Sequence, residues 1–274
     1  MSGVPGARRA LGALSGGLDR LRPAPRGVAV LAYHRVGAAT PVSVDLPVGQ
    51  VAEQLDWLCA SSRLLTLDDA ATRLVDPSGD PPGRPEVVLT ADDGTADWTE
   101  VLLALLVDRQ LAMTWYVATR FVDEGLEFPN GGRPVSWSAL RDAVSTGLVT
   151  VGSHTHSHAV MARLDAAGAA QELDRSASLI EDRLGQPCHH FAYPKAIAPS
   201  EMADREVRRR FRTAALAGTR INVAGRTDLG RLGRSPIQRR DSIERFAAKV
   251  AGAGRTEGWV RERYDRRRHH DALG

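Results

Sequence analysis

Short apolar runs that suit β-strands alternate with amphipathic patterns that suit α-helices along most of this chain. Strand-like runs occupy residues 28–34, 87–89, 113–117, 148–151, 190–194, 213–216 and 232–238. The intervening segments place apolar residues at helical spacing, and no segment repeats another. Strands that alternate with helices in this way pair in parallel, so the sequence predicts an α/β fold, either an open parallel sheet or a parallel (β/α) barrel of about seven strands.

Several helix boundaries are marked by capping residues. Thr66 is placed to cap a short helix that continues through Val75. A longer amphipathic helix is predicted over residues 165–184, closed by Gly185. Residues 241–244, with the sequence Asp-Ser-Ile-Glu, have capping-box spacing before the last helix.

Two adjacent aspartates end the second strand-like run. Asp92 and Asp93 follow the apolar residues 87–89, and Gly94 allows a sharp turn directly after them. Neighbouring carboxylates at a strand end are costly unless a positive charge lies between them or one takes up a proton. A divalent metal would supply that charge. For this segment alone, an Asp-Asp-Gly turn that caps a helix is an equal alternative.

Three histidines within five residues follow the fourth strand-like run. His154 and His158 are four residues apart, so one helical turn or a tight loop could direct both rings at one ion, whereas His156 should point elsewhere. Imidazole is the commonest neutral metal ligand in proteins. The alternative is three surface histidines in a polar loop. Together with the two aspartates, however, the cluster predicts a metal centre.

The chemically reactive candidates share a position in the predicted fold. Each lies at or just past the C-terminal end of a strand, which is where barrels gather catalytic groups. These candidates are His34, Asp92, Asp93, His154, Tyr193 and Arg234.

Composition and charge exclude several classes of protein. The chain has 274 residues with 36 basic and 33 acidic side chains spread widely, so it shows no nucleic-acid footprint. No segment has the roughly 20 apolar residues that span a bilayer. The N-terminus lacks the apolar core of a signal peptide, which predicts a cytoplasmic protein. We divide the chain into an N-terminal extension, 1–27, one domain, 28–252, and a basic tail, 253–274.

Four motifs in order resemble those of the polysaccharide deacetylases, the NodB-homology family also called carbohydrate esterase family four. Residues 90–94, Thr-Ala-Asp-Asp-Gly, are similar to the family's Thr-Phe-Asp-Asp-Gly, and residues 154–158 are similar to its His-Ser/Thr-x-x-His. Ser136-Trp137 and the segment 191–194, Phe-Ala-Tyr-Pro, occur in the family's order and spacing. The resemblance covers about residues 28–250 and implies a distorted (β/α) barrel of the NodB type.

The resemblance also implies a hydrolase of non-peptide carbon–nitrogen bonds, with acetylated glycans as substrates. By similarity, Asp93, His154 and His158 would hold a divalent metal, usually zinc, and Asp92 would be the general base. An Asp, His, His set leaves coordination positions for water and substrate, as catalytic zinc sites require. If the protein is cytoplasmic, the substrate would be a glycan precursor rather than a finished wall polymer.

The general acid and the oxyanion donor depart from the commonest family pattern. No histidine lies between His190 and His269, so the usual C-terminal Leu-x-His motif is absent. In the subgroup that opens with a Tyr-His strand, the opening histidine is the acid, which corresponds to His34; a structural histidine is the alternative.

Three further residues have roles implied by the same resemblance. Arg234 is similar to a subgroup Leu-Pro-Arg and could orient Asp92 or a sugar hydroxyl, or be a plain surface arginine. Tyr193 and Lys195 are the predicted substrate and oxyanion residues, although Lys195-Ala196 replaces a usual Tyr-Gly. Losing one oxyanion donor would raise the reaction barrier by about 2.7–4 kcal/mol.

The sequence leaves three alternative functions open. The first is removal of acetyl groups, chiefly the N-acetyl groups of amino sugars, from a polysaccharide, oligosaccharide or glycan precursor. The second is hydrolysis of a smaller amide by the same metal centre. The third is a catalytically weak carbohydrate-binding relic, which the Lys195-Ala196 substitution and the missing C-terminal histidine allow.

Overall fold

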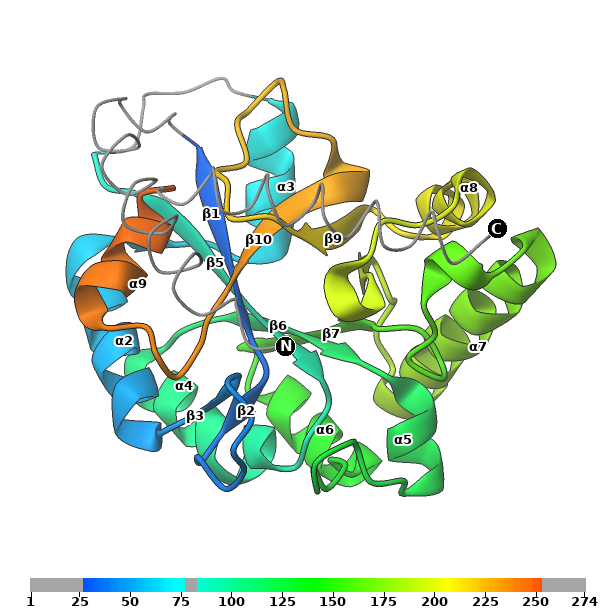
Figure 1. The fold of residues 1–274 in the computed structure, drawn as a ribbon, viewed down its shortest axis with the longest axis horizontal. Coiled ribbons are helices and arrows are strands. Elements are labelled where there is room, and N and C mark those ends of the chain that lie inside the picture. The colour runs from blue at the N-terminus through cyan, green and yellow to red at the C-terminus, as the bar shows by residue number, and fades with distance from the viewer. Residues whose placement is uncertain (1–26, 77–82, 253–274) are drawn as a thin grey trace, which may run out of the picture.

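Seven parallel strands close into a barrel in the computed structural model, which describes residues 27–76 and 83–252 (Figure 1). The order around the barrel is β1-β10-β9-β8-β7-β6-β5, and β5 pairs back with β1. The strands are β1 (Val28–Tyr33), β5 (Glu86–Asp93), β6 (Met113–Val117), β7 (Val149–Ser153), β8 (His190–Ala192), β9 (Thr213–Ala217) and β10 (Leu232–Pro236). The predicted barrel of about seven strands is therefore confirmed.

The number of paired residues differs between neighbouring strands of the barrel. β1 and β5 pair over six residues, whereas β7 and β8 meet only at Ser153 and Phe191. A short edge strand, β4 (Arg63–Leu64), adds to the beginning of β5 outside the ring. Two more short strands, β2 (Arg35–Val36) and β3 (Asp45–Leu46), form a separate pair beyond the end of β1.

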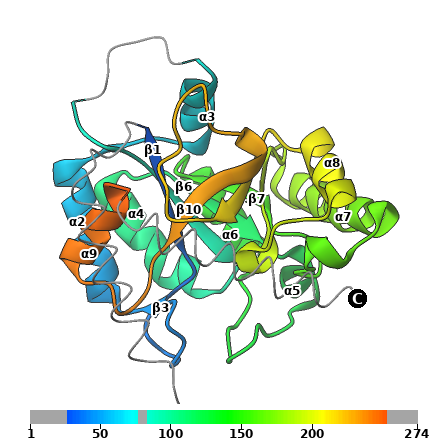
Figure 2. The ribbon, with the colours of Figure 1, turned by 45° about the horizontal axis from the view of Figure 1, so that its top comes forward.

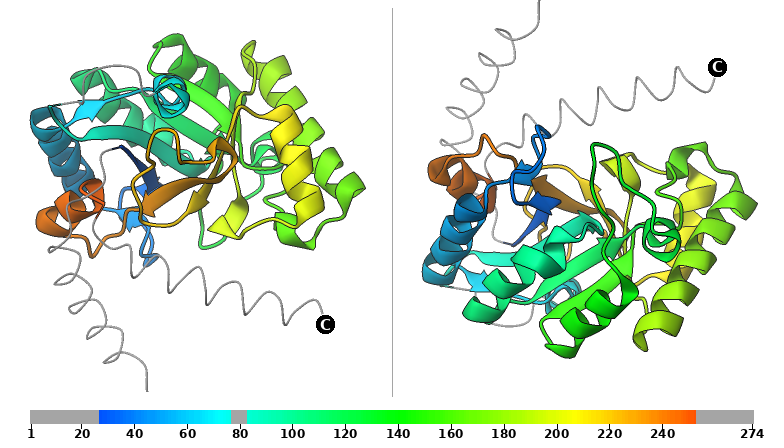
Figure 3. Two further views of the ribbon diagram at one scale, coloured as in Figure 1. Left: turned by 90° about the horizontal axis from the view of Figure 1, so that it is seen from above. Right: turned by 90° about the horizontal axis from the view of Figure 1, so that it is seen from below.

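Helices cover most of the outside of the barrel, as Figure 3 shows from above and below. They are α2 (Val48–Ser61), α3 (Leu67–Val75), α4 (Leu103–Arg109), α5 (Thr119–Glu124), α6 (Trp137–Ser145), α7 (Ala166–Leu184), α8 (Glu201–Arg210) and α9 (Ile243–Val250). In Figure 2, α2 and α9 lie together on one flank and α7 and α8 on the other. Among the described residues, no helix is long and apolar enough to cross a membrane.

Capping residues set most helix boundaries as the sequence predicts. The Thr66 hydroxyl accepts a hydrogen bond from the Asp69 N–H at 3.1 Å, and Gly185 ends α7 in the left-handed conformation. The last helix begins one residue later than the capping-box spacing suggests. Ser242 is its cap, because the Asp241 carboxylate instead binds Lys249 and the Gln238 N–H.

Alternating strand residues divide the core in two. One set packs against the surrounding helices and includes Leu31, Leu89 and Trp115. The other set includes Val30 and Val88 and packs with apolar residues of α3. Because apolar residues of α3 cluster with Val28 at the start of β1, α3 covers the N-terminal end of the barrel and leaves the C-terminal strand ends for polar groups (Figure 1).

Two predicted segments are not described by the structure. The basic tail, 253–274, and the N-terminal extension except Gly27 lie outside the described residues. The proposed division of the chain into an extension, a domain and a tail stays a prediction.

Candidate metal and catalytic site

Asp93, His154 and His158 come together at the C-terminal end of the barrel. The Asp93 Oδ1 lies 3.7 Å from the His154 Nε2 and 3.4 Å from the His158 Nε2. One ligand atom from each of the three residues lies within 4.8 Å of the others. Ligands held about 2.0–2.1 Å from one tetrahedral ion are separated by about 3.4 Å. The three side chains therefore have the spacing of a single metal site.

The chemistry of His154 fits a metal ligand. Its Nδ1 lies 2.8 Å from the carbonyl oxygen of Ala192, so Nδ1 carries the proton and donates. The Nε2 lone pair then faces Asp93, in the arrangement by which a carbonyl orients a metal-binding histidine. Burial lowers the pKa of His154 to about 4, which keeps the ring neutral near pH 7.

A distortion of the backbone allows two adjacent aspartates to serve one site. Neighbouring strand residues normally point to opposite faces of a sheet. Asp93 has a φ of 92°, a region that side chains other than glycine seldom adopt, and Gly94 follows with a φ of 109°. This strain at the end of β5 accompanies the placement of Asp93 in the ligand cluster while Asp92 stays buried beside Arg234.

Asp92 is held by two hydrogen bonds from one arginine. The Arg234 guanidinium donates to the Asp92 Oδ1 at 2.5 Å and to Oδ2 at 2.7 Å. The two residues are 5% and 2% exposed, so this ion pair is buried. Burial alone would raise the pKa of Asp92, but the charge of Arg234 outweighs it and the pKa lies below its ordinary value. The predicted partnership of Arg234 with Asp92 is thus present in the structure.

Tyr116 supports Arg234 inside the barrel. The guanidinium carbon lies 5.2 Å from the centre of the Tyr116 ring, which is a cation–π distance. Tyr116 pairs with Gly152 on β7, and a Cβ at Gly152 would approach the Tyr116 ring to 2.9 Å. A side chain at position 152 would therefore displace the ring on which Arg234 rests.

Gly152→Ala is accordingly expected to lower the free energy of unfolding by about 1–3 kcal/mol. The added methyl group would meet the His190 carbonyl oxygen at 2.7 Å as well as the Tyr116 ring, and the backbone oxygen cannot easily give way. Urea denaturation measures the effect. Gly49→Ala in α2, where nothing lies within 4 Å of an added Cβ, is the matched control and should be neutral or stabilising. Equal stability of the two variants would contradict this account of Gly152.

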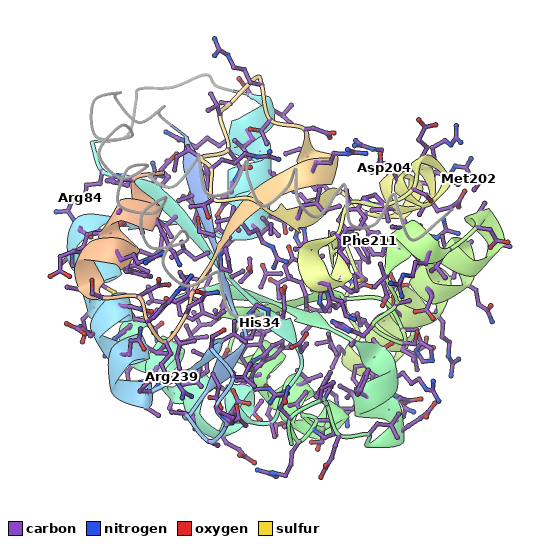
Figure 4. The ribbon with its side chains drawn as sticks, in the orientation of Figure 1. His34, Arg84, Met202, Asp204, Phe211 and Arg239 are labelled. Atoms are coloured by element: carbon purple, nitrogen blue, oxygen red, sulfur yellow. The ribbon has the colours of Figure 1, made fainter. Side chains whose placement is uncertain are left out.

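His34 lies close to both carboxylates. Its charge contributes to the lowered pKa of Asp92 and of Asp93, and its Nδ1 is buried without a hydrogen-bond partner among the described residues. The indole N–H of Trp98 donates to the His34 carbonyl oxygen at 2.6 Å and fixes the main chain there. Figure 4 shows His34 near the middle of the molecule.

Other predicted residues have partners away from the cluster. The Tyr193 hydroxyl donates to Asp204 at 3.1 Å, and its N–H donates to the Ala215 carbonyl. Figure 4 places Asp204 on α8, toward the edge of the molecule, so the Tyr193 side chain is directed away from His34. His156 turns to the Thr119 hydroxyl, as predicted. Lys195 is exposed, and its predicted oxyanion role and that of Tyr193 stay predictions.

Two supporting residues were not singled out from the sequence. Tyr116 lies in a strand rich in apolar residues, where only its pairing with Gly152 reveals its place beneath Arg234. Glu172 lies on α7 three residues after the buried Ala169 and four before the buried Ser176, and it binds the histidine loop. A polar residue at an inward strand position is the pattern that would have indicated Tyr116.

Comparison with known proteins identifies one family match. Residues 79–213 match the family model described as polysaccharide deacetylase. No curated protein sequence matches the chain.

Solved structures share the fold at low sequence identity. The deacetylase PplD of Streptococcus pyogenes, solved in complex with acetate, is 18% identical, with a TM-score of 0.72 over 82% of this chain and 99% of that one. IcaB from Ammonifex degensii is 23% identical, with a TM-score of 0.70 over 83% of this chain and 98% of that one. The match assigns residues 79–213 to the polysaccharide deacetylase family, whose members are hydrolases that act on carbon–nitrogen bonds other than peptide bonds.

Proposed function

We propose that this protein is a metal-dependent deacetylase that removes acetyl groups, chiefly the N-acetyl groups of amino sugars, from a polysaccharide, oligosaccharide or glycan precursor. The observation that carries the proposal is the cluster of Asp93, His154 and His158 with the Arg234-bound Asp92 beside it. The proposal assigns a divalent cation, zinc by preference, to the three clustered residues. Two neutral imidazoles and one carboxylate are typical of catalytic zinc sites that keep an open position.

The proposal gives each residue of the site a separate role in hydrolysis. A divalent cation bound here would polarise the acetyl carbonyl and lower the pKa of water. Asp92 is positioned as the general base that accepts the proton of the attacking water. Its two bonds to Arg234 fix the carboxylate and keep it ionised in a buried place. Arg234 thus acts on the reaction by orienting Asp92.

His34 is the proposed general acid for the departing amine. It lies near both carboxylates, and its buried Nδ1 has no partner among the described residues, so the ring is not committed to a structural bond at that atom. This position of His34 supports the proposal that the protein belongs to the subgroup that opens with a Tyr-His strand, in which the opening histidine is the acid. The acid must donate a proton as the carbon–nitrogen bond breaks, and histidine does this near neutral pH.

The backbone near Lys195 bears on the proposed oxyanion donor. Lys195 and Ala196 have φ angles of 56° and 55°, although neither is glycine. The segment therefore adopts the left-handed conformation that a glycine at this place would adopt readily. This supports the proposal that the Lys195-Ala196 substitution leaves the path of the main chain, and with it a backbone donor, in place.

The proposal is tested by acetate release from a panel of acetylated glycans, with zinc-loaded protein and with protein stripped by a chelator. Release from oligomers or polymers by the loaded protein alone is the expected result. Release only from free N-acetyl sugars or simple amides would instead support the small-amide hydrolase. Glycan binding without release from any substrate would contradict the deacetylase proposal and favour the binding relic.

A further inference from the structure

The loop that carries His158 has a strained backbone. Thr155 has a φ of 65° and His158 a φ of 60°, so two of the five residues in 154–158 occupy the left-handed region without being glycine. Such conformations persist only where the surrounding structure over-determines them. From one side, the Thr155 hydroxyl accepts the N–H of Ala159 at 2.9 Å. The carbonyls of Thr155 and His156 also accept N–H groups, those of Thr119 and Arg120. The second half of the loop, Ser157 and His158, needs a restraint of its own.

Glu172 of α7 supplies that restraint through Ser157. Its Oε2 accepts the Ser157 N–H at 2.8 Å, and its Oε1 accepts the Ser157 hydroxyl at 2.8 Å. Both carboxylate oxygens thus bind one residue. Within residues 27–76 and 83–252, the hydrogen bonds of the Glu172 carboxylate are the two to Ser157.

The two histidine ligands differ in how they are held. His154 is 2% exposed, and its ring is fixed by the Ala192 carbonyl. The His158 side chain is 25% exposed, and no hydrogen-bond partner for its Nδ1 is found in the described part of the chain. The His158 Nε2 contacts Asp93, but among the described residues its ring has no backbone anchor like that of His154. Its direction therefore depends strongly on its own backbone, and Ser157 is the residue directly before it.

We propose that Glu172 is a positioning residue of the metal centre, which holds the His158 loop in ligand geometry through the main chain and side chain of Ser157. The inference rests on the metal site of the proposed function and deepens it. Charged acceptors make hydrogen bonds stronger than neutral ones, so two such bonds to one residue can hold a strained turn before any metal arrives. Glu172 is not itself one of the three clustered ligand residues.

Metal affinity of the Glu172→Ala and Glu172→Gln variants tests the proposal. Loss of a partner that orients a ligand typically lowers metal affinity by about 10–100-fold, which is the expected result for Glu172→Ala. Glu172→Gln should lose less, because its amide oxygen can still accept the Ser157 N–H and its amide nitrogen can donate to the Ser157 hydroxyl, both as weaker neutral hydrogen bonds. Affinity is measured by zinc competition against a chelating dye, and the visible absorption of the cobalt-loaded protein reports ligand geometry.

A control on the same helix separates positioning from general stability. Glu181 also accepts a backbone N–H, that of Cys188 at 3.2 Å, but it holds a segment that carries no proposed ligand. Glu181→Ala should therefore bind zinc as the wild type does, with an unchanged cobalt spectrum. Wild-type affinity and spectrum in both Glu172 variants would overturn the inference, even if their apo melting temperatures fell.

The zinc-affinity test of Glu172 does not depend on whether the protein releases acetate. If the wild type binds one zinc but releases no acetate, the proposed deacetylase function fails, and the comparison of affinities still decides the role of Glu172. If the wild type binds no divalent metal, both proposals are overturned together.

Discussion

Replacing Asp92 with asparagine is expected to lower kcat/KM for acetate release by roughly 10²–10⁴-fold, the range usual for loss of a general base. Asparagine keeps the size of the side chain and one acceptor oxygen for Arg234 but cannot take a proton at neutral pH. The change leaves Asp93, His154 and His158 in place, so the variant should still bind one metal ion. Steady-state kinetics with the best glycan of the panel measure the loss.

Two controls make the Asp92→Asn result specific. Zinc stoichiometry and affinity should match those of the wild type, because Asp92 is not one of the three clustered ligand residues. The melting temperature shows whether the buried neighbourhood of Arg234 has been disturbed. Activity within a few-fold of the wild type, with metal bound, would contradict the assignment of Asp92 as the base.

The location of the site could be predicted from the sequence because local pattern and topology agree. Parallel strands that alternate with helices bring their C-terminal ends to one side, so Asp93 at the end of β5 and His154 after β7 were expected to meet. The spacing of His154 and His158 was sufficient to predict a shared ligand site. The roles of these residues in catalysis stay predictions until activity is measured.

The supporting contacts could not be predicted because they join residues distant in sequence. Arg234 could have been a surface residue, and only the closure of β10 beside β1 brings it to Asp92. The hydroxyl of Tyr193 turns to Asp204 because α8 packs there, which no local pattern indicates. Elements as short as α5, with six residues, lack the two helical turns over which apolar periodicity can be recognised.

The long strand β5 shows a related limit of pattern analysis. The apolar run 87–89 predicts a short strand, but β5 extends to Asp93 and includes both acids. Inside a barrel, polar residues can continue a strand when they find partners there. Thr90 donates to the Leu31 carbonyl at 2.8 Å, and Asp92 binds Arg234, so neither residue ends the ladder. Hydrophobicity alone therefore places the end of this strand too early.

Arg234→Met is expected to lower the free energy of unfolding of the metal-free protein by about 3–5 kcal/mol, the usual cost of leaving one partner of a buried ion pair alone. Methionine is unbranched like the stem of arginine and can pack toward the Tyr116 ring, but it is shorter and donates no hydrogen bond to the buried Asp92 carboxylate. Deacetylation should fall as well, since the base loses both bonds that orient it. Urea denaturation at pH 7 and kinetics with added zinc measure the two effects.

The double variant Asp92→Asn/Arg234→Met separates charge from packing. If the cost of Arg234→Met arises from an uncompensated carboxylate, neutralising position 92 removes that charge, and the double variant should be more stable than Arg234→Met alone. If the cost arises from lost packing, the second substitution should add its own destabilisation and the two effects should sum. A sum within about 0.5 kcal/mol would therefore refute the ion pair as the reason for Arg234, and would leave its role in orienting the base to be judged from the kinetics alone.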